Sequence, residues 1–137
     1  IIPMTSQNTV VKLNESNLKN KMNHWKKIII SAAEQSGRVK LPAIIKPIPF
    51  SKELLNEYKS PGSYFLDTTG DSGFSKKKIS KTTIVVGPEG GFTTDEKQIA
   101  IDTGYKIVKT GPRLLRTETA PIMAISILQY LYGDFSN

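Results

Sequence analysis

Two runs of β-branched and apolar residues in the second half of the chain are each followed by a pattern of helical spacing. Residues 82–86 form a continuous run, and residues 105–109 carry a shorter one. Runs of this kind predict strands buried on both faces, which are typical of parallel sheets. The alternation of strand and helix therefore predicts an α/β fold with a mostly parallel sheet flanked by helices.

The first predicted helix covers residues 17–36. Its apolar positions recur every three or four residues and share one face. They are Leu18, Met22, Trp25, Ile29 and Ala32 or Ala33. Gly37 suits the left-handed residue that commonly ends a helix. A shorter helix is predicted from Ser51, a favourable N-cap, through residue 58.

Two further helices follow the two strands. Thr93 and Glu96 form a capping-box pattern that opens a helix to about residue 103, and Gly104 closes it. The last helix covers residues 119–132, with Pro121 tolerated in its first turn. Few polar residues interrupt it, so we expect it to be deeply buried or to lie in a subunit interface.

The remaining segments predict short strands and loops. Residues 9–13 alternate weakly and predict a strand, whereas residues 41–49 hold three prolines and must be extended or irregular. Residues 64–66 predict a short strand after a Pro-Gly turn. Residues 68–81 are rich in Gly, Ser, Thr and Lys, so we expect a mobile loop there.

Composition fits one domain with an uneven charge. The chain has 137 residues and a net charge of +7. Residues 1–60 carry ten Lys or Arg against four Asp or Glu, whereas residues 93–137 carry five of each. A basic amino-terminal half is typical of proteins that bind a polyanion such as RNA, and equally of a solvated lysine-rich face.

Several kinds of site are excluded by composition. The chain has no cysteine, which excludes disulfides and thiolate metal ligands, and with His24 as its one histidine we expect no metal site. No apolar run reaches the length of a membrane span. The chain begins at Ile1 rather than at methionine, so we expect the original amino terminus to lie upstream.

The loops that follow the two strands carry the candidate chemistry. Residues 86–92 read VGPEGGF, and residues 110–120 read TGPRLLRTETA. Both loops follow strand carboxyl ends, where α/β proteins bind ligands, and glycine lets a ligand approach the backbone closely. Neither loop matches the dinucleotide fingerprint or the P-loop, and no serine elbow accompanies His24. We favour a ligand site over a plain tight turn.

Charged residues in the second loop add to this interpretation. Two of the three arginines, Arg113 and Arg116, fall there, although lysines number sixteen. The planar guanidinium is hard to replace where a phosphate, carboxylate or base edge is gripped. Two residues of this loop also have plainer explanations. Glu118, in the first turn of the last predicted helix, would offset the helix dipole, and Arg116 would suit a surface ion pair.

The two loops resemble the signature of the RsmE family, SPOUT-class methyltransferases that modify N3 of a uridine in bacterial small-subunit (16S) ribosomal RNA. The matching residues are 87–92 and 111–120, supported by EQSGR at 34–38, Ile2-Pro3 and VVK at 10–12. The resemblance covers nearly the whole chain. It implies a SPOUT-type fold with a carboxyl-terminal trefoil knot, a homodimer, a cytoplasmic location and no membrane partner.

The resemblance also implies bound S-adenosylmethionine. The residues that match the family's cofactor contacts are Leu66, Val85, Val86, Gly87, Glu89, Gly90, Gly91, Thr110, Gly111, Leu114, Leu115 and Arg116. For catalysis we expect Glu118 or Glu89 to accept the N3 proton and Arg116 to stabilise charge on the uracil oxygens. Arg38 and Arg113 are the candidate RNA contacts.

The chain also departs from the family pattern. We expect residues 1–137 to correspond to the methyltransferase domain without its opening strand and helix, and without the family's amino-terminal PUA-like RNA-binding domain. Two alternatives stay open. One is a basic RNA-binding module without catalysis, and the other is another knotted RNA methyltransferase or an α/β enzyme with a different nucleotide-like ligand.

Overall fold

The computed structural model describes residues 1–10 and 15–136, and the chain divides into two compact units. The first unit contains Ile1–Thr5 and Val10–Pro49. The second contains Ser6–Thr9 and Phe50–Asn137. The chain therefore enters the second unit for four residues, returns to the first, and then completes the second.

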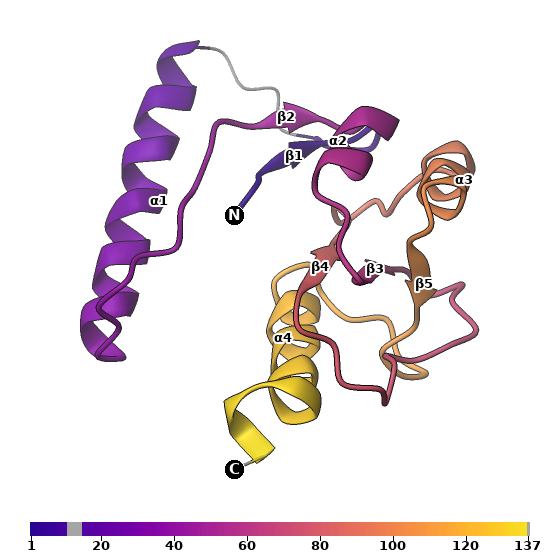
Figure 1. Cartoon of the computed structure of the whole chain (residues 1–137). Coiled ribbons are helices and arrows are strands. Elements are labelled where there is room, and N and C mark those ends of the chain that lie inside the picture. Colours follow the sequence, from indigo (N-terminus) through magenta and orange to yellow (C-terminus); the bar gives the residue numbers. More distant parts are fainter. Residues whose placement is uncertain (11–14, 137) are drawn as a thin grey trace. The chain divides into compact units, whose positions relative to one another are not determined.

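The first unit holds a two-stranded parallel sheet and the long helix. Strand β1 (Met4–Thr5) pairs with β2 (Ile48–Pro49), and helix α1 covers Glu15–Gln35 (Figure 1). The predicted helix is confirmed; on its predicted apolar face Leu18, Met22, Trp25 and Ile29 are half-buried and Ala33 is buried. Thr9 and Val10 are irregular rather than extended in a strand, and the rest of the predicted strand lies outside the described residues.

Gly37 ends helix α1 as predicted. Its φ is 69°, in the left-handed region that glycine adopts without penalty. The amide of Gly37 donates to the carbonyl of Glu34 at 3.2 Å, and the amide of Arg38 donates to the carbonyl of Ala33 at 2.9 Å. These two bonds form a Schellman motif, which satisfies carbonyls that the helix itself leaves unpaired.

The second unit is built on a three-stranded parallel sheet. Strand β3 (Gly62–Leu66) lies between β4 (Thr82–Val85) and β5 (Lys106–Val108) (Figure 1). Phe65 of β3 is in register with Val85 on one side and with Ile107 on the other. All three strands therefore end at one edge of the sheet, which confirms the predicted parallel arrangement.

Helices flank this sheet as the α/β prediction requires. They are α2 (Lys52–Glu57), α3 (Thr94–Asp102) and α4 (Thr119–Tyr132), followed by the 3₁₀ turn η1 (Asp134–Ser136). The predicted caps are present: the Ser51 hydroxyl accepts from the amide of Leu54, and Thr93 and Glu96 form a reciprocal capping box. The trefoil knot stays a prediction.

The two faces of the sheet have different partners. On one face Tyr64, Leu66 and Val108 form a core cluster with Ala124 and Leu128 of α4. On the other face the fully buried Phe65 lies 4.2 Å from the Phe92 ring and 6.4 Å from the Phe50 ring, measured between ring centroids. Alternation of side chains along β3 explains the division.

Helix α4 is buried on one side only. Ala124 is fully buried, whereas Ile122 is 67% exposed and Ile125 is 52% exposed. Deep burial, the first of the two alternatives predicted for this helix, is therefore wrong for the single chain. None of the helices in the described part of the chain is long and apolar enough to cross a membrane.

Candidate functional site

A pocket of about 480 Å³ opens where the three strands of the second unit end. Three segments form it: the residues after β3, the glycine-rich loop after β4 and the longer loop between β5 and α4. The lining residues are Leu66, Asp67, Thr68, Val86, Gly87, Pro88, Glu89, Gly91, Phe92, Val108, Lys109, Thr110, Gly111, Arg113, Leu114, Leu115, Arg116, Thr117, Glu118 and Ala120. Its size lies within the range of small-molecule sites.

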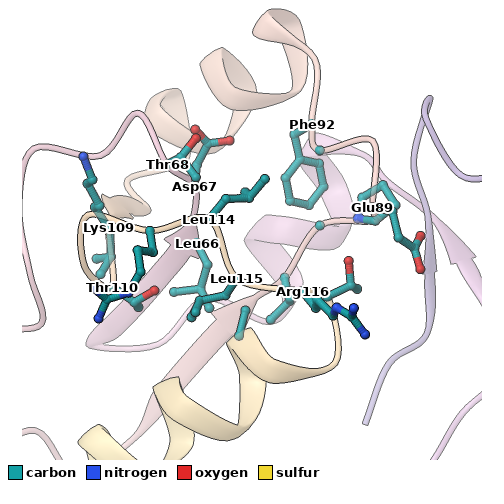
Figure 2. Close-up of a pocket in the computed structure, with 18 of the residues that line it drawn as sticks. Leu66, Asp67, Thr68, Glu89, Phe92, Lys109, Thr110, Leu114, Leu115 and Arg116 are labelled. Carbon is teal, nitrogen blue, oxygen red and sulfur yellow. The ribbon is translucent and has the colours of Figure 1, made fainter.

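The pocket has an apolar middle and charged ends. Leu66, Leu114 and Leu115 lie in its middle, whereas Lys109 lies at one end and Glu89 and Arg116 lie towards the other (Figure 2). An apolar site with a few placed polar groups holds a ligand by burial and fixes its orientation by hydrogen bonds. The arrangement suits a small ligand that carries both apolar and polar parts.

The glycine-rich loop after β4 needs its glycines for defined reasons. A Cβ on Gly87 would lie 2.9 Å from the ring of Phe92, so only glycine allows this ring to pack under the loop. Gly91 has a φ of 66°, and a Cβ there would meet open space. The loop thus exposes its backbone on the side of Gly91 while Phe92 anchors it to the aromatic cluster.

A segment from the start of the chain holds the same loop. The side-chain amide of Asn8 donates to the carbonyl oxygens of Gly90 at 3.2 Å and Gly91 at 3.1 Å. The backbone amide of Gln7 donates to Glu96 Oε1 at 2.9 Å. Glu96 is buried, and its second oxygen accepts from the backbone amide of Thr93. Sequence analysis missed Asn8, because nothing in the local pattern connects it to a loop 82 residues away.

The second loop brings the candidate catalytic charges together. Arg116 Nη1 lies 3.9 Å from Glu118 Oε1, and their side chains are 87% and 69% exposed. Glu118 occupies the N-cap position of α4, but its side chain makes no capping hydrogen bond. The carboxylate therefore serves the ion pair and is accessible for other chemistry.

Gly111, in the same loop, has a φ of 131°, where other residues are strained. A Cβ built on Gly111 would meet nothing within 4 Å. Its backbone is thus open to the pocket, as close contact with a ligand requires.

Asp67 lines the pocket just after β3 and was not among the predicted site residues. Burial by itself raises the pKa of this carboxyl, but hydrogen bonds from Thr69 and the nearby Lys97 ammonium outweigh burial, so the pKa of Asp67 lies below its ordinary value. Asp67 Oδ1 accepts from the Thr69 hydroxyl at 2.6 Å and lies 3.5 Å from Lys97 Nζ. Its place directly after a strand is the signal that could have identified it.

Most predicted site residues of the second unit meet at this pocket, and two do not. Val85 is buried in β4, and Gly90 turns its carbonyl to Asn8; neither lines the pocket. Arg38 belongs to the first unit and is exposed, whereas Arg113 lines the pocket. In the described part of the chain no cluster of three or more His, Asp or Glu side chains is suited to a metal ion.

Comparison with known proteins identifies the family. The model of a family described as RNA methyltransferase domain matches residues 1–129. A Ribosomal RNA small subunit methyltransferase E of Buchnera aphidicola is 34% identical over 98% of this chain and 54% of the relative. The protein of the same name from Bacillus subtilis is 34% identical over 97% of this chain and 57% of the relative. The chain therefore spans about half the length of the curated relatives it matches.

Two solved structures have the same fold. A Legionella pneumophila chain in complex with the bound cofactor SAM superposes with a TM-score of 0.90 at 32% identity, covering 97% of this chain and 55% of that one. A Ribosomal RNA small subunit methyltransferase E from Neisseria gonorrhoeae, bound to S-adenosyl methionine, gives a TM-score of 0.83 at 35% identity, with the same coverage.

Proposed function

The chain belongs to the family of RNA methyltransferase domains, and we propose that it binds S-adenosylmethionine and methylates small-subunit ribosomal RNA. We further propose N3 of a uridine as the methylated atom, on the strength of the RsmE-like loops. The observation that carries the proposal is a pocket built from the same two loops at the carboxyl ends of parallel strands. Proteins of this fold with 32% and 35% identity are bound to this cofactor.

The pocket fits such a cofactor on the geometry of this chain. Its volume suits a ligand of this size, and backbone left open at Gly91 and Gly111 allows close contact. The apolar side chains of Leu66, Val86 and Leu115 would cover an adenine ring. S-adenosylmethionine supplies an electrophilic methyl group on a sulfonium, so positioning of the two reactants contributes much of the catalysis.

The residues of the chain would manage the proton and the charge. Transfer to N3 of a uridine requires the N3 proton to leave, and Glu118 or Glu89 would accept it. Arg116 would stabilise the negative charge that develops on the uracil oxygens. Arg116 and Glu118 form one ion pair, and Glu89 lies towards the same end of the pocket as Arg116 (Figure 2).

We also propose that the protein works as a homodimer through α4. Ile122 and Ile125 lie one turn apart on this helix and are both more than half exposed. Exposed apolar side chains at this spacing suit a helix that packs against a second copy. An Ile125→Glu variant should sediment as a monomer where the wild type sediments as a dimer, and a wild-type monomer at micromolar concentration would refute this part.

Calorimetric titration with S-adenosylmethionine tests the proposal, with ATP and NAD as controls. We expect saturable binding of one S-adenosylmethionine per chain and none of the controls. Methyl transfer to a small-subunit ribosomal RNA transcript follows, and Arg116→Ala should lower kcat by about 10²-fold or more. Unchanged kcat in this variant would remove the role of Arg116, and RNA binding without cofactor binding would favour a module without catalysis.

A further inference from the structure

Four lysines fall within seven residues between β3 and β4. This segment, residues 75–81, reads SKKKISK and contains no acidic residue; we call it the lysine loop. Lys76, Lys77, Lys78 and Lys81 are all exposed. A run of lysines is by itself an ordinary solvated surface, so whether this one is a binding surface depends on the contacts around the loop.

The start of the lysine loop is held by a ring of hydrogen bonds. The Ser75 amide donates to the Tyr64 hydroxyl at 3.3 Å, and the Tyr132 hydroxyl donates to the Ser75 carbonyl. The two tyrosine hydroxyls lie 3.2 Å apart. Because Tyr132 already donates to Ser75, the Tyr64 hydroxyl is the donor between the two tyrosines. Phe74, the preceding residue, packs edge-on against the Tyr64 ring at 4.9 Å.

The end of the lysine loop is held as well. Ile79 packs against the core cluster beneath α4. A Cβ on Gly62 would lie 3.1 Å from Ile79 Cγ2, so the glycine at the start of β3 makes room for this side chain. The Gly62 amide also donates to the Lys81 carbonyl at 3.2 Å. Lys76–Lys78 therefore form a short cationic span between two fixed points.

Among the described residues, no carboxylate forms an ion pair with this span. The ion pairs in the described part of the chain join Lys97 to Asp67 and Arg116 to Glu118, and neither involves the lysine loop. No side-chain hydrogen bond is recorded there for the four ammonium groups either. Exposed lysines on a segment that is anchored at both ends, with no carboxylate paired to them among the described residues, suit phosphates as external partners.

We propose that the lysine loop is a docking surface for the phosphate backbone of RNA, an inference that rests on the proposed function. An RNA is favoured over a protein partner because lysine is depleted in protein interfaces, whose centres need aromatic or apolar anchors. The only apolar side chain of the loop, Ile79, faces the core. The surface lies outside the pocket residues, so it adds affinity for RNA without contacting the cofactor.

The test is a triple variant, Lys76→Gln, Lys77→Gln and Lys78→Gln, beside a control with the same loss of charge. The control changes Lys52, Lys59 and Lys106, which are exposed in the same unit. Binding of poly(U) and of a small-subunit ribosomal RNA transcript is measured across a series of salt concentrations. Three lost phosphate contacts should weaken binding about 10- to 50-fold at 0.15 M salt and reduce the salt slope by about 2. The control variant should change the RNA affinity and the salt slope by only a fraction of these amounts.

Three outcomes would overturn the proposal. They are equal losses in the two triple variants, no RNA binding by the wild type, and poly-glutamate binding to the loop as strongly as RNA. Calorimetry with S-adenosylmethionine on the same samples separates this inference from the proposed function. A wild type that binds no cofactor refutes the proposed function, whereas unchanged RNA binding in the lysine-loop variant refutes only the docking surface.

Discussion

The side-chain nitrogen of Asn8 lies 3.2 Å from the carbonyl oxygen of Gly90, although 82 residues separate them in the chain. The same nitrogen also donates to Gly91, so one side chain satisfies two successive carbonyls of the glycine-rich loop. A loop with few side chains has little packing of its own to fix its shape. The hydrogen bonds from Asn8 therefore restrain a loop whose glycines have no side chains to restrain it.

Replacing Asn8 should loosen this loop and weaken ligand binding. In Asn8→Ala two hydrogen bonds are lost, and we expect the affinity for S-adenosylmethionine to fall roughly five- to tenfold, corresponding to about 1 kcal/mol. Gln7→Ala is the matched control, because Gln7 is exposed and it is its backbone amide that bonds Glu96. Calorimetry and amide hydrogen exchange of residues 90–92 measure both effects. Equal affinities in the two variants would show that the loop keeps its shape without Asn8.

Gly111 should tolerate no side chain. Its φ of 131° lies where residues with a Cβ are strained, so Gly111→Ala should cost about 1–3 kcal/mol, as unfolding free energy or as lost cofactor affinity. Gly73→Ala is the control, since a Cβ there also meets open space and its φ is not positive in this range. Urea unfolding and cofactor titration of both variants check this. A Gly111→Ala protein as stable and as tightly bound as the control would contradict the prediction.

Asp67 should make the protein sensitive to acid. Its folded pKa is lowered, so its contribution to stability is present above the unfolded value near 4 and is lost as the pH falls through the folded pKa. Asp67→Asn should therefore lose less stability than the wild type between pH 5 and pH 2. Urea unfolding at several pH values measures this, with Asp71→Asn, an exposed residue of the same loop, as control. Parallel curves for wild type and Asp67→Asn would refute it.

Local patterns predicted the elements that depend on local physics. The capping box of Thr93 and Glu96, the left-handed Gly37 and the limits of α4 all follow from neighbouring residues, and the structure confirms them. The pocket was predicted from two loops because parallel strands bring their carboxyl ends to one edge. Asp67 and Lys109 were missed, although each directly follows a strand of the same sheet and the same rule applies to them.

Contacts between distant segments could not be predicted from the sequence. Residues 68–81 were expected to be a mobile loop because their composition is polar and glycine-rich. They are irregular, as expected, but Ser72 pairs with Val108 of β5, and a Cβ on Gly70 would lie 2.7 Å from the backbone nitrogen of Lys109. Nothing near Ser72 or Gly70 in sequence encodes the neighbouring strand, so composition alone could not reveal these contacts.

Tyr132 offers the sharpest stability prediction, because its hydroxyl joins helix α4 to the lysine loop and to β3. Tyr132→Phe leaves the Ser75 carbonyl and the Tyr64 hydroxyl each without one partner, so we expect unfolding free energy to fall by about 1–2 kcal/mol. Tyr130→Phe is the control on the same helix, because Tyr130 is 64% exposed and its hydroxyl has no recorded partner in the described part of the chain. Guanidinium unfolding of the two variants at pH 7 compares the loss of the hydrogen-bonded Tyr132 hydroxyl with the loss of the exposed Tyr130 hydroxyl.

The same residue predicts an alkaline limit. Burial raises the pKa of Tyr132 to about 12, above the value near 10 expected for the unfolded chain. A raised pKa contributes stability that is complete below pH 10 and is lost as the pH rises through 12. The difference in unfolding free energy between wild type and Tyr132→Phe should therefore shrink between pH 10 and pH 12. If the difference in unfolding free energy stayed constant over that interval, the hydrogen bonds among Ser75, Tyr64 and Tyr132 would not depend on the Tyr132 proton.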